Sequence, residues 1–183
     1  MDNVEIVPCR QEGADWLLDW IDNEKLLYQW SGSEFTFPLS KEQLERYMAK
    51  AEKEDTYHFQ VEADGKIVGH ASLGRVDLRH QTGRLGKVFI APPYNGKGFA
   101  KEMIKQILAF AYEQLDLHRI SLGVFNFNIP AIKLYESFGF QKEGLLRDVI
   151  RINGSFWNVY EMSLLRPEWE TLIATTNDKQ SGI

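Results

Sequence analysis

The chain has 183 residues, a length that predicts one domain able to bury its own hydrophobic core. Its composition, 44% apolar and 26% charged with a net charge of −5, is that of a globular protein and lacks the basic balance of a general nucleic-acid binder. Cys9 is the only cysteine, which excludes an intrachain disulfide. We see no signal peptide and no run of 18 apolar residues, so we expect a cytoplasmic protein that does not span a membrane.

The N-terminal region, residues 14–55, is predicted to be helical. The segment "ADWLLDWIDNEKLLYQW" (14–30) places tryptophan, leucine and isoleucine at helical spacing. Ser40 then opens a second helix, with Gln43 as its capping-box partner. The apolar positions of this second helix form one buried stripe: Leu44, Tyr47, Met48 and Ala51.

A sheet follows, because the hydrophobic period changes to two. The segment "HFQVEADGKIVGHASL" (58–73) predicts a hairpin about Asp64-Gly65, a pair that tolerates the positive φ angles of a tight turn. The strand 84–90, a glycine-rich loop, an amphipathic helix from Ala100 to Leu115 and the strand 119–125 then form a βαβ unit with a parallel strand pair.

The C-terminal third predicts a short helix and a second hairpin. Asn128 caps the helix, Pro130 lies in its first turn, and Gly139 ends it. The segment 147–165 reads as two strands about Asn153-Gly154. The polar tail, 172–183, is expected to be loose. The order of elements predicts a single α+β domain over residues 1–183, with a mixed sheet within residues 56–166.

The glycine loop "APPYNGKGFAKEM" (91–103) suggests a phosphate site, but it fits neither of two common motifs. A Walker A loop needs Ser or Thr after Gly96-Lys97 and a glycine at Ala91. A dinucleotide fingerprint needs a third glycine where Lys101 stands. Two interpretations remain: main-chain N–H groups at a helix N-terminus bind a pyrophosphate, or the glycines only permit a tight turn.

A second motif, "NIPAIKLYESFGF" (128–140), favours the first interpretation. Together with "NGKGFA" (95–100) it resembles the two motifs of the GNAT superfamily of acetyl-CoA-dependent N-acetyltransferases, although Asn95 replaces the usual Gln or Arg. The resemblance covers roughly residues 58–165. The final segment, 143–169, resembles the branch that contains ribosomal-protein N-terminal acetyltransferases and related small-amine acetyltransferases.

This resemblance implies the fold, the reaction and the site. The fold is a mixed antiparallel and parallel sheet, splayed at the cofactor site and flanked by helices, with the helices of residues 14–55 walling the acceptor cleft. The reaction moves an acetyl group from acetyl-CoA directly to a primary amine. Tyr135 protonates the departing thiolate. The cofactor-binding residues are Val88, Phe89, Ile90, Asn95, Gly96, Lys97, Gly98, Phe99, Ala100, Asn128 and Ala131.

The base that deprotonates the amine is not indicated by the sequence. The possible residues are Glu34, Asp77, His80, Glu143 and Asp148, acting directly or through water. His70 is typical of a sheet residue, and His58 and His118 of residues at strand edges. No grouping has metal-ligand spacing, so we expect no metal.

Several alternatives stay open. Five N-terminal aromatic residues line the acceptor cleft or only fill the core: Trp16, Trp20, Trp30, Phe35 and Phe37. The acceptor is a small-molecule amine, a polyamine or a protein N-terminus. The chain could instead be a non-catalytic acetyl-CoA sensor or interaction module, or could transfer a longer acyl group. A monomer and a homodimer are both compatible with the family.

Overall fold

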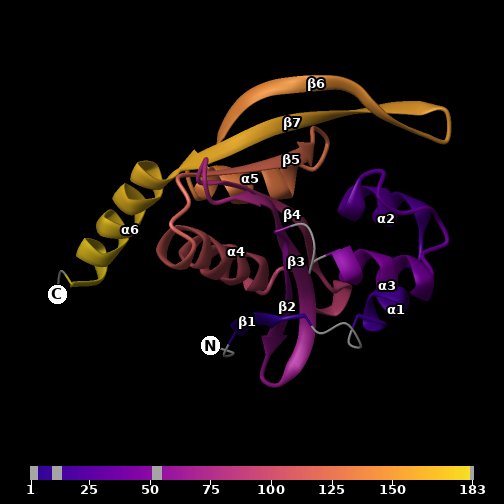
Figure 1. Ribbon diagram of the computed structural model, residues 1–183, viewed down its shortest axis with the longest axis horizontal. Helices are drawn as coiled ribbons and strands as arrows, with labels where there is room; N and C mark the ends of the chain where they lie inside the picture. The colour runs from indigo at the N-terminus through magenta and orange to yellow at the C-terminus, as the bar shows by residue number, and fades with distance from the viewer. Residues whose placement is uncertain (1–3, 10–13, 51–54, 182–183) are drawn as a thin grey trace.

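The computed structural model describes residues 4–9, 14–50 and 55–181. Seven strands form one sheet in the order β1-β2-β3-β4-β5-β7-β6 (Figure 1). Their bounds are β1 (Val4–Pro8), β2 (Tyr57–Ala63), β3 (Lys66–Asp77), β4 (Thr82–Ile90), β5 (Arg119–Phe125), β6 (Gln141–Ile152) and β7 (Ser155–Leu165). Neighbouring strands are antiparallel except β4 and β5. The predicted mixed sheet and its parallel pair are therefore confirmed.

The helices lie on both sides of the sheet (Figure 1). They are α1 (Trp16–Trp20), α2 (Glu24–Ser31), α3 (Lys41–Lys50), α4 (Phe99–Ala109), α5 (Ile129–Ser137) and α6 (Arg166–Ser181). The main hydrophobic core joins α4 and α5 to the sheet, and a smaller one lies among α1, α2 and α3. The apolar stripe predicted for the long helix is buried, with Met103, Ile104 and Ile107 fully enclosed.

The prediction of one helix over residues 14–30 is wrong, because Asn23 starts a new helix. Its side chain accepts a hydrogen bond from the N–H of Leu26 at 2.9 Å, which caps α2. Ser40 caps α3 as predicted, accepting from the N–H of Gln43 at 3.4 Å. The Gln43 side chain bonds to carbonyl groups of the preceding loop instead of closing the capping box. Ala51 lies outside the described residues.

Both predicted hairpins are confirmed. Asp64-Gly65 has φ angles of +50° and +74°, and Asn153-Gly154 has +47° and +81°, as two-residue turns of this type require. The sequence did not indicate β1, which pairs with β2 at the edge of the sheet. The Gln106 side chain of α4 holds this strand, accepting from the N–H of Ile6 at 2.9 Å and donating to the carbonyl of Val4 at 2.7 Å.

The tail expected to be loose is helical as far as Ser181, where α6 ends, and residues 182 and 183 lie outside the described residues. Glu168 accepts a hydrogen bond from the N–H of Leu165 at 2.9 Å and so caps the helix. Trp169 is buried against Tyr112, with ring centroids 5.2 Å apart. The sequence "LRPEW" does contain this capping signal, a glutamate three residues after Leu165.

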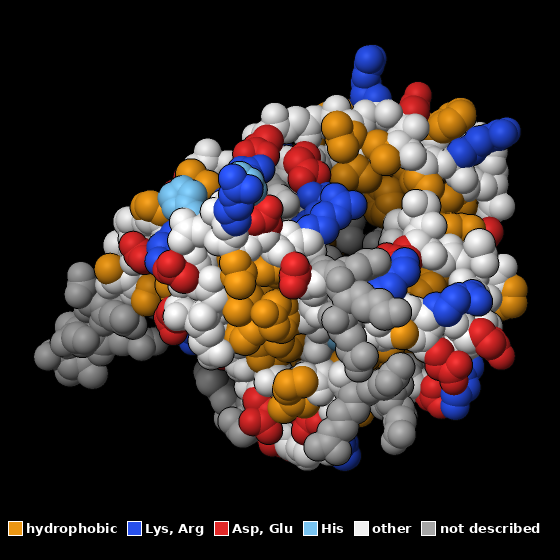
Figure 2. All heavy atoms as spheres, in the orientation of Figure 1, with side chains coloured by type: hydrophobic (Ala, Val, Ile, Leu, Met, Phe, Trp, Pro, Cys, Tyr) orange, Lys and Arg blue, Asp and Glu red, His pale blue; other side chains and the backbone are white. Residues whose placement is uncertain are grey.

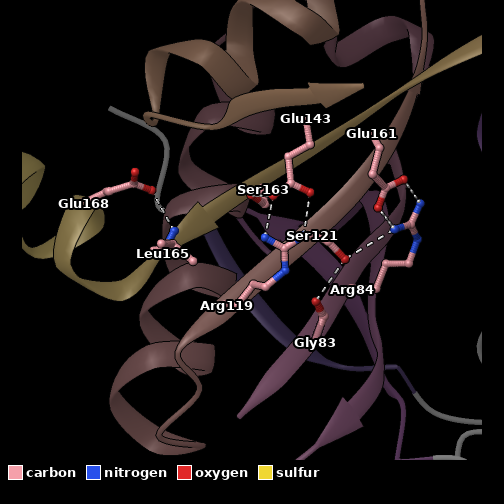
Figure 3. A network of polar contacts seen from close by, with 9 residues as sticks. All are labelled: Gly83, Arg84, Arg119, Ser121, Glu143, Glu161, Ser163, Leu165 and Glu168. Atoms are coloured by element: carbon pink, nitrogen blue, oxygen red, sulfur yellow. Dashed lines mark hydrogen bonds and ion pairs between the residues drawn. The ribbon is translucent and has the colours of Figure 1, made fainter. Parts of the chain in front are cut away.

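The parallel strands β4 and β5 separate after three residue pairs. Thr82 to Arg84 pair with Arg119 to Ser121, and beyond them the strands diverge. Arg84 ties the closed end together: it donates to Glu161 of β7 at 2.9 Å and to Ser121 of β5 at 3.3 Å (Figure 3). A Cβ on Gly123 would lie 2.8 Å from the Arg84 guanidinium, so the glycine leaves the space in which this side chain crosses β5. The predicted splay is therefore held at its closed end by an ion pair.

Candidate active site

A cavity of about 720 Å³ runs through the gap between β4 and β5. Its walls come from the second half of β4, the end of β5 and α5 on one side, and from α2, α3 and the middle of β3 on the other. The β6–β7 hairpin adds Leu146, Val149 and Val159. The space-filling view shows a hollow near the middle of this face, with lysine or arginine side chains close to it (Figure 2). The cavity therefore connects the two sides of the sheet.

A β-bulge at Lys87 shapes the β4 wall. Lys87 has a φ of +48°, and the register of β4 with β3 shifts at this point. The extra residue reverses the alternation of side chains, so Val88 and Ile90 line the cavity while Phe89 packs among α1, α2 and α3. Since β5 has already diverged, the main-chain groups on that edge of β4 have no partner strand. The bulge thus offers hydrogen-bonding backbone to whatever enters the gap.

The loop before α4 presents main-chain N–H groups at one end of the cavity. Gly96 and Gly98 have φ angles of +76° and +84°, and a Cβ on either would meet nothing within 4 Å. The first hydrogen bonds of α4 run to the carbonyl of Gly98 from residues 101 and 102. The N–H groups of residues 96–100 therefore have no main-chain acceptor in the described part of the chain. Such a row, at the positive end of a helix, suits an anion.

The opposite wall is formed by α5. The Asn128 side chain accepts from the N–H of Ala131 at 3.4 Å, and both residues line the cavity. Tyr135 also lines it, with 7% of its surface exposed and its ring centroid 5.8 Å from that of Phe140. Burial raises the pKa of the Tyr135 phenol above its usual value, so the phenol keeps its proton at neutral pH. Its hydroxyl makes no hydrogen bond to a described residue.

The comparisons with known proteins agree with this geometry. The sequence model of the acetyltransferase (GNAT) family matches residues 25–140. The chain is 35% identical over 136 residues to YokL, an uncharacterized N-acetyltransferase from the SPbeta prophage of Bacillus subtilis, covering 73% of this chain and 76% of the relative. It is 31% identical over 107 residues to YdaF, a putative ribosomal N-acetyltransferase of Bacillus subtilis, covering 58% of each.

Among solved structures, the spermidine N-acetyltransferase from Vibrio cholerae in complex with CoA and spermine matches with a TM-score of 0.81 at 26% identity. The match covers 91% of this chain and 98% of that chain. The chain belongs to the acetyltransferase (GNAT) family. It is an N-acetyltransferase, and acetyl-CoA is its co-substrate.

The residues predicted to hold the cofactor fall into three groups in this acetyltransferase. Six line the cavity: Val88, Ile90, Asn95, Ala100, Asn128 and Ala131. Gly96, Lys97 and Gly98 belong to the exposed loop beside them, and the Lys97 ammonium lies 5.3 Å from the ring centroid of Tyr94. The side chains of Phe89 and Phe99 are buried away from the cavity, so only their main-chain groups are available to a ligand.

One of the five residues considered as a base, Glu34, lines the cavity. Its carboxylate oxygens lie 2.8 Å from Nζ of Lys87 and 3.2 Å from Nζ of Lys50. Burial alone would raise the pKa of Glu34, but the hydrogen bonds and charges of the two lysines outweigh it and lower the pKa. A carboxylate held in this way accepts a proton poorly near neutral pH.

The other four residues do not line the cavity. Asp77 and His80 form the turn between β3 and β4, where Asp77 accepts from the N–H of His80 at 2.9 Å. Glu143 bonds to an arginine of β5 and a serine of β7 (Figure 3), and these hydrogen bonds lower its pKa to about 2. Asp148 is exposed on β6. Direct proton transfer from an amine in the cavity to any of these four has no geometric support.

The N-terminal aromatic residues mainly fill the smaller core. Trp30 and Phe35 are buried and stacked, with ring centroids 5.3 Å apart. Of the five predicted aromatic residues, Trp30 lines the cavity, and its Nε1 donates to the carbonyl of Lys87 at 2.9 Å. Trp16 and Trp20 are half-buried, and Phe37 is 42% exposed. The principal contribution of this cluster to the site is therefore to fix the bulge.

The sequence did not indicate a polar cluster buried beneath α2 and α3. The Tyr47 hydroxyl lies 3.1 Å from Nε2 of the fully buried His70, and the Tyr47 ring centroid lies 4.2 Å from that of His58. His58 and Ser72 line the cavity. Both ring nitrogens of His58 are buried without a hydrogen-bond partner among the described residues. His58 is indeed near a strand end, as expected, but the packing of α3 over β2 encloses it; the exposed His118 has no such cover.

Within the described ranges, no group of three or more His, Cys, Asp or Glu side chains is arranged to hold a metal ion, and the absence of a metal stays a prediction. No helix in these ranges combines the length and the apolar character needed to cross a membrane.

Proposed function

We propose that the cavity is the active site, in which the acetyl group passes from acetyl-CoA directly to a primary amine. The observation that carries this proposal is the free edge of β4 at Val88 and Ile90, which lies between the donor-rich glycine loop and Tyr135. Pantetheine amides would pair with this edge as an added strand does, and the N–H groups of residues 96–100 would bind the pyrophosphate. The Asn128 amide would hold the pantetheine arm.

In the transfer step, the amine nitrogen attacks the thioester carbonyl carbon. The new bond joins nitrogen to that carbon, and the carbon–sulfur bond breaks. A main-chain N–H at the bulge stabilises the oxyanion in the intermediate. The departing thiolate takes the proton of the Tyr135 hydroxyl, which is later restored from solvent.

The proton lost by the amine passes to water in the cavity. Glu34 is a weak acceptor because two lysines hold it, but the same positive charges make it easier for a bound amine to lose its proton. The protein therefore needs no strong carboxylate base beside the acceptor.

The chemical class of the acceptor, the oligomeric state and the cellular location of the enzyme are proposals. The relatives include both a putative ribosomal and a spermidine N-acetyltransferase, so a small amine, a polyamine and a protein N-terminus all stay open. The branch of ribosomal-protein N-terminal acetyltransferases, a monomeric or homodimeric state and a cytoplasmic location are likewise predictions.

Two measurements test the proposal. Calorimetry with acetyl-CoA should show saturable binding, and thiol release should rise above background when polyamines, amino acids, aminoglycosides or N-terminal peptides are added in turn. Saturable binding without thiol release for any amine would favour the sensor or interaction module instead. An absence of binding at millimolar acetyl-CoA would refute the assignment of the cavity.

A further inference from the structure

The cavity lining carries more positive than negative charge. The charged side chains that line it within the described residues are Glu34, Lys50, Arg75, Arg84 and Lys87. Arg84 is already neutralised by Glu161, which it contacts through both of its terminal nitrogens. Three cations then face one carboxylate. Arg75 has no ion pair with a described residue, so an excess of positive charge is present before any acceptor binds.

A polyamine fits this lining poorly. Aliphatic amines have pKa values near 10, so a polyamine enters with several positive charges at neutral pH. A carboxylate is the strongest protein partner for an ammonium, but both oxygens of Glu34, the carboxylate of the lining, are engaged, at 2.8 Å by Lys87 and at 3.2 Å by Lys50. Like charges brought close together in a partly enclosed site repel one another and select against such a ligand.

The acceptor side of the cavity, by which we mean the side formed by α2, α3 and β3, contains a histidine without a hydrogen-bond partner among the described residues. His58, Ser72 and Gly86 lie side by side across β2, β3 and β4, so they face the same side of the sheet. Gly86 adjoins the bulge, and the spacing of strands places His58 about 10 Å from it. Buried polar groups are nearly always hydrogen-bonded, yet neither ring nitrogen of His58 has a partner among the described residues. This row of three residues therefore runs from the bulge to His58, whose ring has no hydrogen-bond partner among the described residues.

Burial, and after it the charge of Lys87, lowers the pKa of His58 to about 4. The ring is therefore neutral at pH 7 and offers one N–H donor to a ligand. The charge of Glu34 acts in the opposite direction but does not outweigh these effects.

We propose that the acceptor is a linear amine that carries a carboxylate at its far end, and that this carboxylate binds Lys50, Arg75 and the N–H of His58. This proposal rests on the proposed function, since the amine must reach the acetyl group at the bulge. Lys50 is 52% exposed and Arg75 is exposed, so both cations can contact a ligand carboxylate, and the ammonium of Lys50 has donors for that contact while it stays beside Glu34. Lys87 is 15% exposed, with its Nζ 4.9 Å from the ring centroid of Tyr47, and continues to hold Glu34.

The test compares matched acceptors in the thiol-release assay. One series consists of linear amino acids from 4-aminobutanoate to 8-aminooctanoate, and the other of the α,ω-diamines of equal length, with spermidine added. We expect kcat/KM for the amino acid to exceed that for its matched diamine by about tenfold or more, as one additional charge-assisted contact predicts. The best amino acid should be one of the longer members, because the carboxylate must reach toward His58.

Substitution of the exposed lysine locates the effect. Lys50→Met should raise KM for the preferred amino acid by about tenfold and lower KM for the diamines, because it removes a repelling charge and frees one oxygen of Glu34, and Lys50→Glu should reverse the preference. Lys41→Met is the matched control: Lys41 is on the same helix, is 56% exposed and pairs with Asp15, but does not line the cavity. His58→Asn should raise KM for the amino acid series, with its fold checked by circular dichroism.

Three results would overturn the proposal while leaving the proposed function intact. These are equal or better use of the diamines or spermidine, an equal effect of Lys41→Met and Lys50→Met, and thiol release with other amines but with neither series. A failure of every amine tested to raise thiol release above background would instead count against the proposed function.

Discussion

Replacement of Tyr135 by phenylalanine separates its chemical role from a role in folding. The hydroxyl makes no hydrogen bond to a described residue, so its removal costs the folded state little, and we expect the melting temperature to change by less than about 4 °C. If the phenol protonates the departing thiolate, kcat should fall by about 10- to 1000-fold, or about 1.4–4 kcal/mol of barrier. Because burial raises the pKa of Tyr135, ionisation of the phenol should not reduce kcat of the unmodified enzyme below about pH 10.

Tyr112 provides the matched control, since it is equally buried but lies outside the cavity. Its hydroxyl donates to the carbonyl of Leu164 at 2.8 Å. Tyr112→Phe should therefore cost about 1 kcal/mol, lowering the melting temperature by about 2–4 °C, while kcat stays unchanged. The assay is thiol release at saturating substrates, with single-turnover kinetics to establish that chemistry limits the rate. An unchanged kcat in Tyr135→Phe under those conditions would refute the acid role, as would an equal loss in both variants.

Three further predictions follow from the backbone and from burial. Gly98→Ala, at a φ of +84°, should lower the free energy of unfolding by about 1–2 kcal/mol and weaken acetyl-CoA binding in calorimetry by about tenfold or more. Gly154→Ala, at a φ of +81° on the remote β6–β7 turn, is the control and should show the same loss of stability without the loss of affinity. Equal affinities of the two variants for acetyl-CoA would contradict the assignment of the loop. In Gly69→Ala the new Cβ meets the main chain of β4, so urea unfolding should show a loss of about 1–3 kcal/mol, whereas Gly144→Ala, with open space around it, should be nearly neutral. The folded-state pKa of His58, about 4, lies below its unfolded value of about 6.5, so the unfolded chain binds more protons on acidification and His58 alone should lower stability by about 2 kcal/mol between pH 7 and pH 5. Burial also lowers the pKa of His70, which adds a loss of the same sign, so the contribution of His58 is the part of the pH dependence that disappears in His58→Asn. An unfolding free energy with the same pH dependence in that variant would exclude His58 as a source.

The parts of the fold that the sequence predicted are those that local chemistry determines. The two hairpins depend on dipeptides whose φ angles few other residues adopt, and the βαβ unit on a change of hydrophobic period. Asn128 and Gly139 bound α5 for the same local reasons. The elements that were missed depend on distant partners: β1 is held by a glutamine of α4, and α6 by the burial of Trp169 against a tyrosine more than fifty residues earlier.

The residues of the candidate site also divide into those that a local motif predicts and those that only the folded chain brings together. The glycine loop and Tyr135 lie within continuous sequence motifs, so the sequence alone predicted them as site residues. The acceptor side is assembled from single residues of the loop after α2, of α3, of β2 and of β4, and no spacing connects Glu34, Lys50, His58 and Lys87 in the chain. Phe89 illustrates the limit of periodicity. Strict alternation would place it with Lys87 on one face, but the bulge reverses that assignment and turns its side chain into the smaller core.

Lys87 connects the two sides of the cavity. Its main chain adopts a φ of +48°, which costs a residue with a side chain about 1–2 kcal/mol relative to glycine, and Trp30 holds its carbonyl. Glycine would remove that strain and keep the bulge, so the strain is explained only if the side chain is needed. That side chain places its ammonium between the Glu34 carboxylate and the Tyr47 ring, where it sets the charge met by an acceptor. Under the proposed function, the backbone of Lys87 would shape the edge of β4 that meets the cofactor, while its side chain holds Glu34, so we expect a change at this position to affect both sides of the cavity.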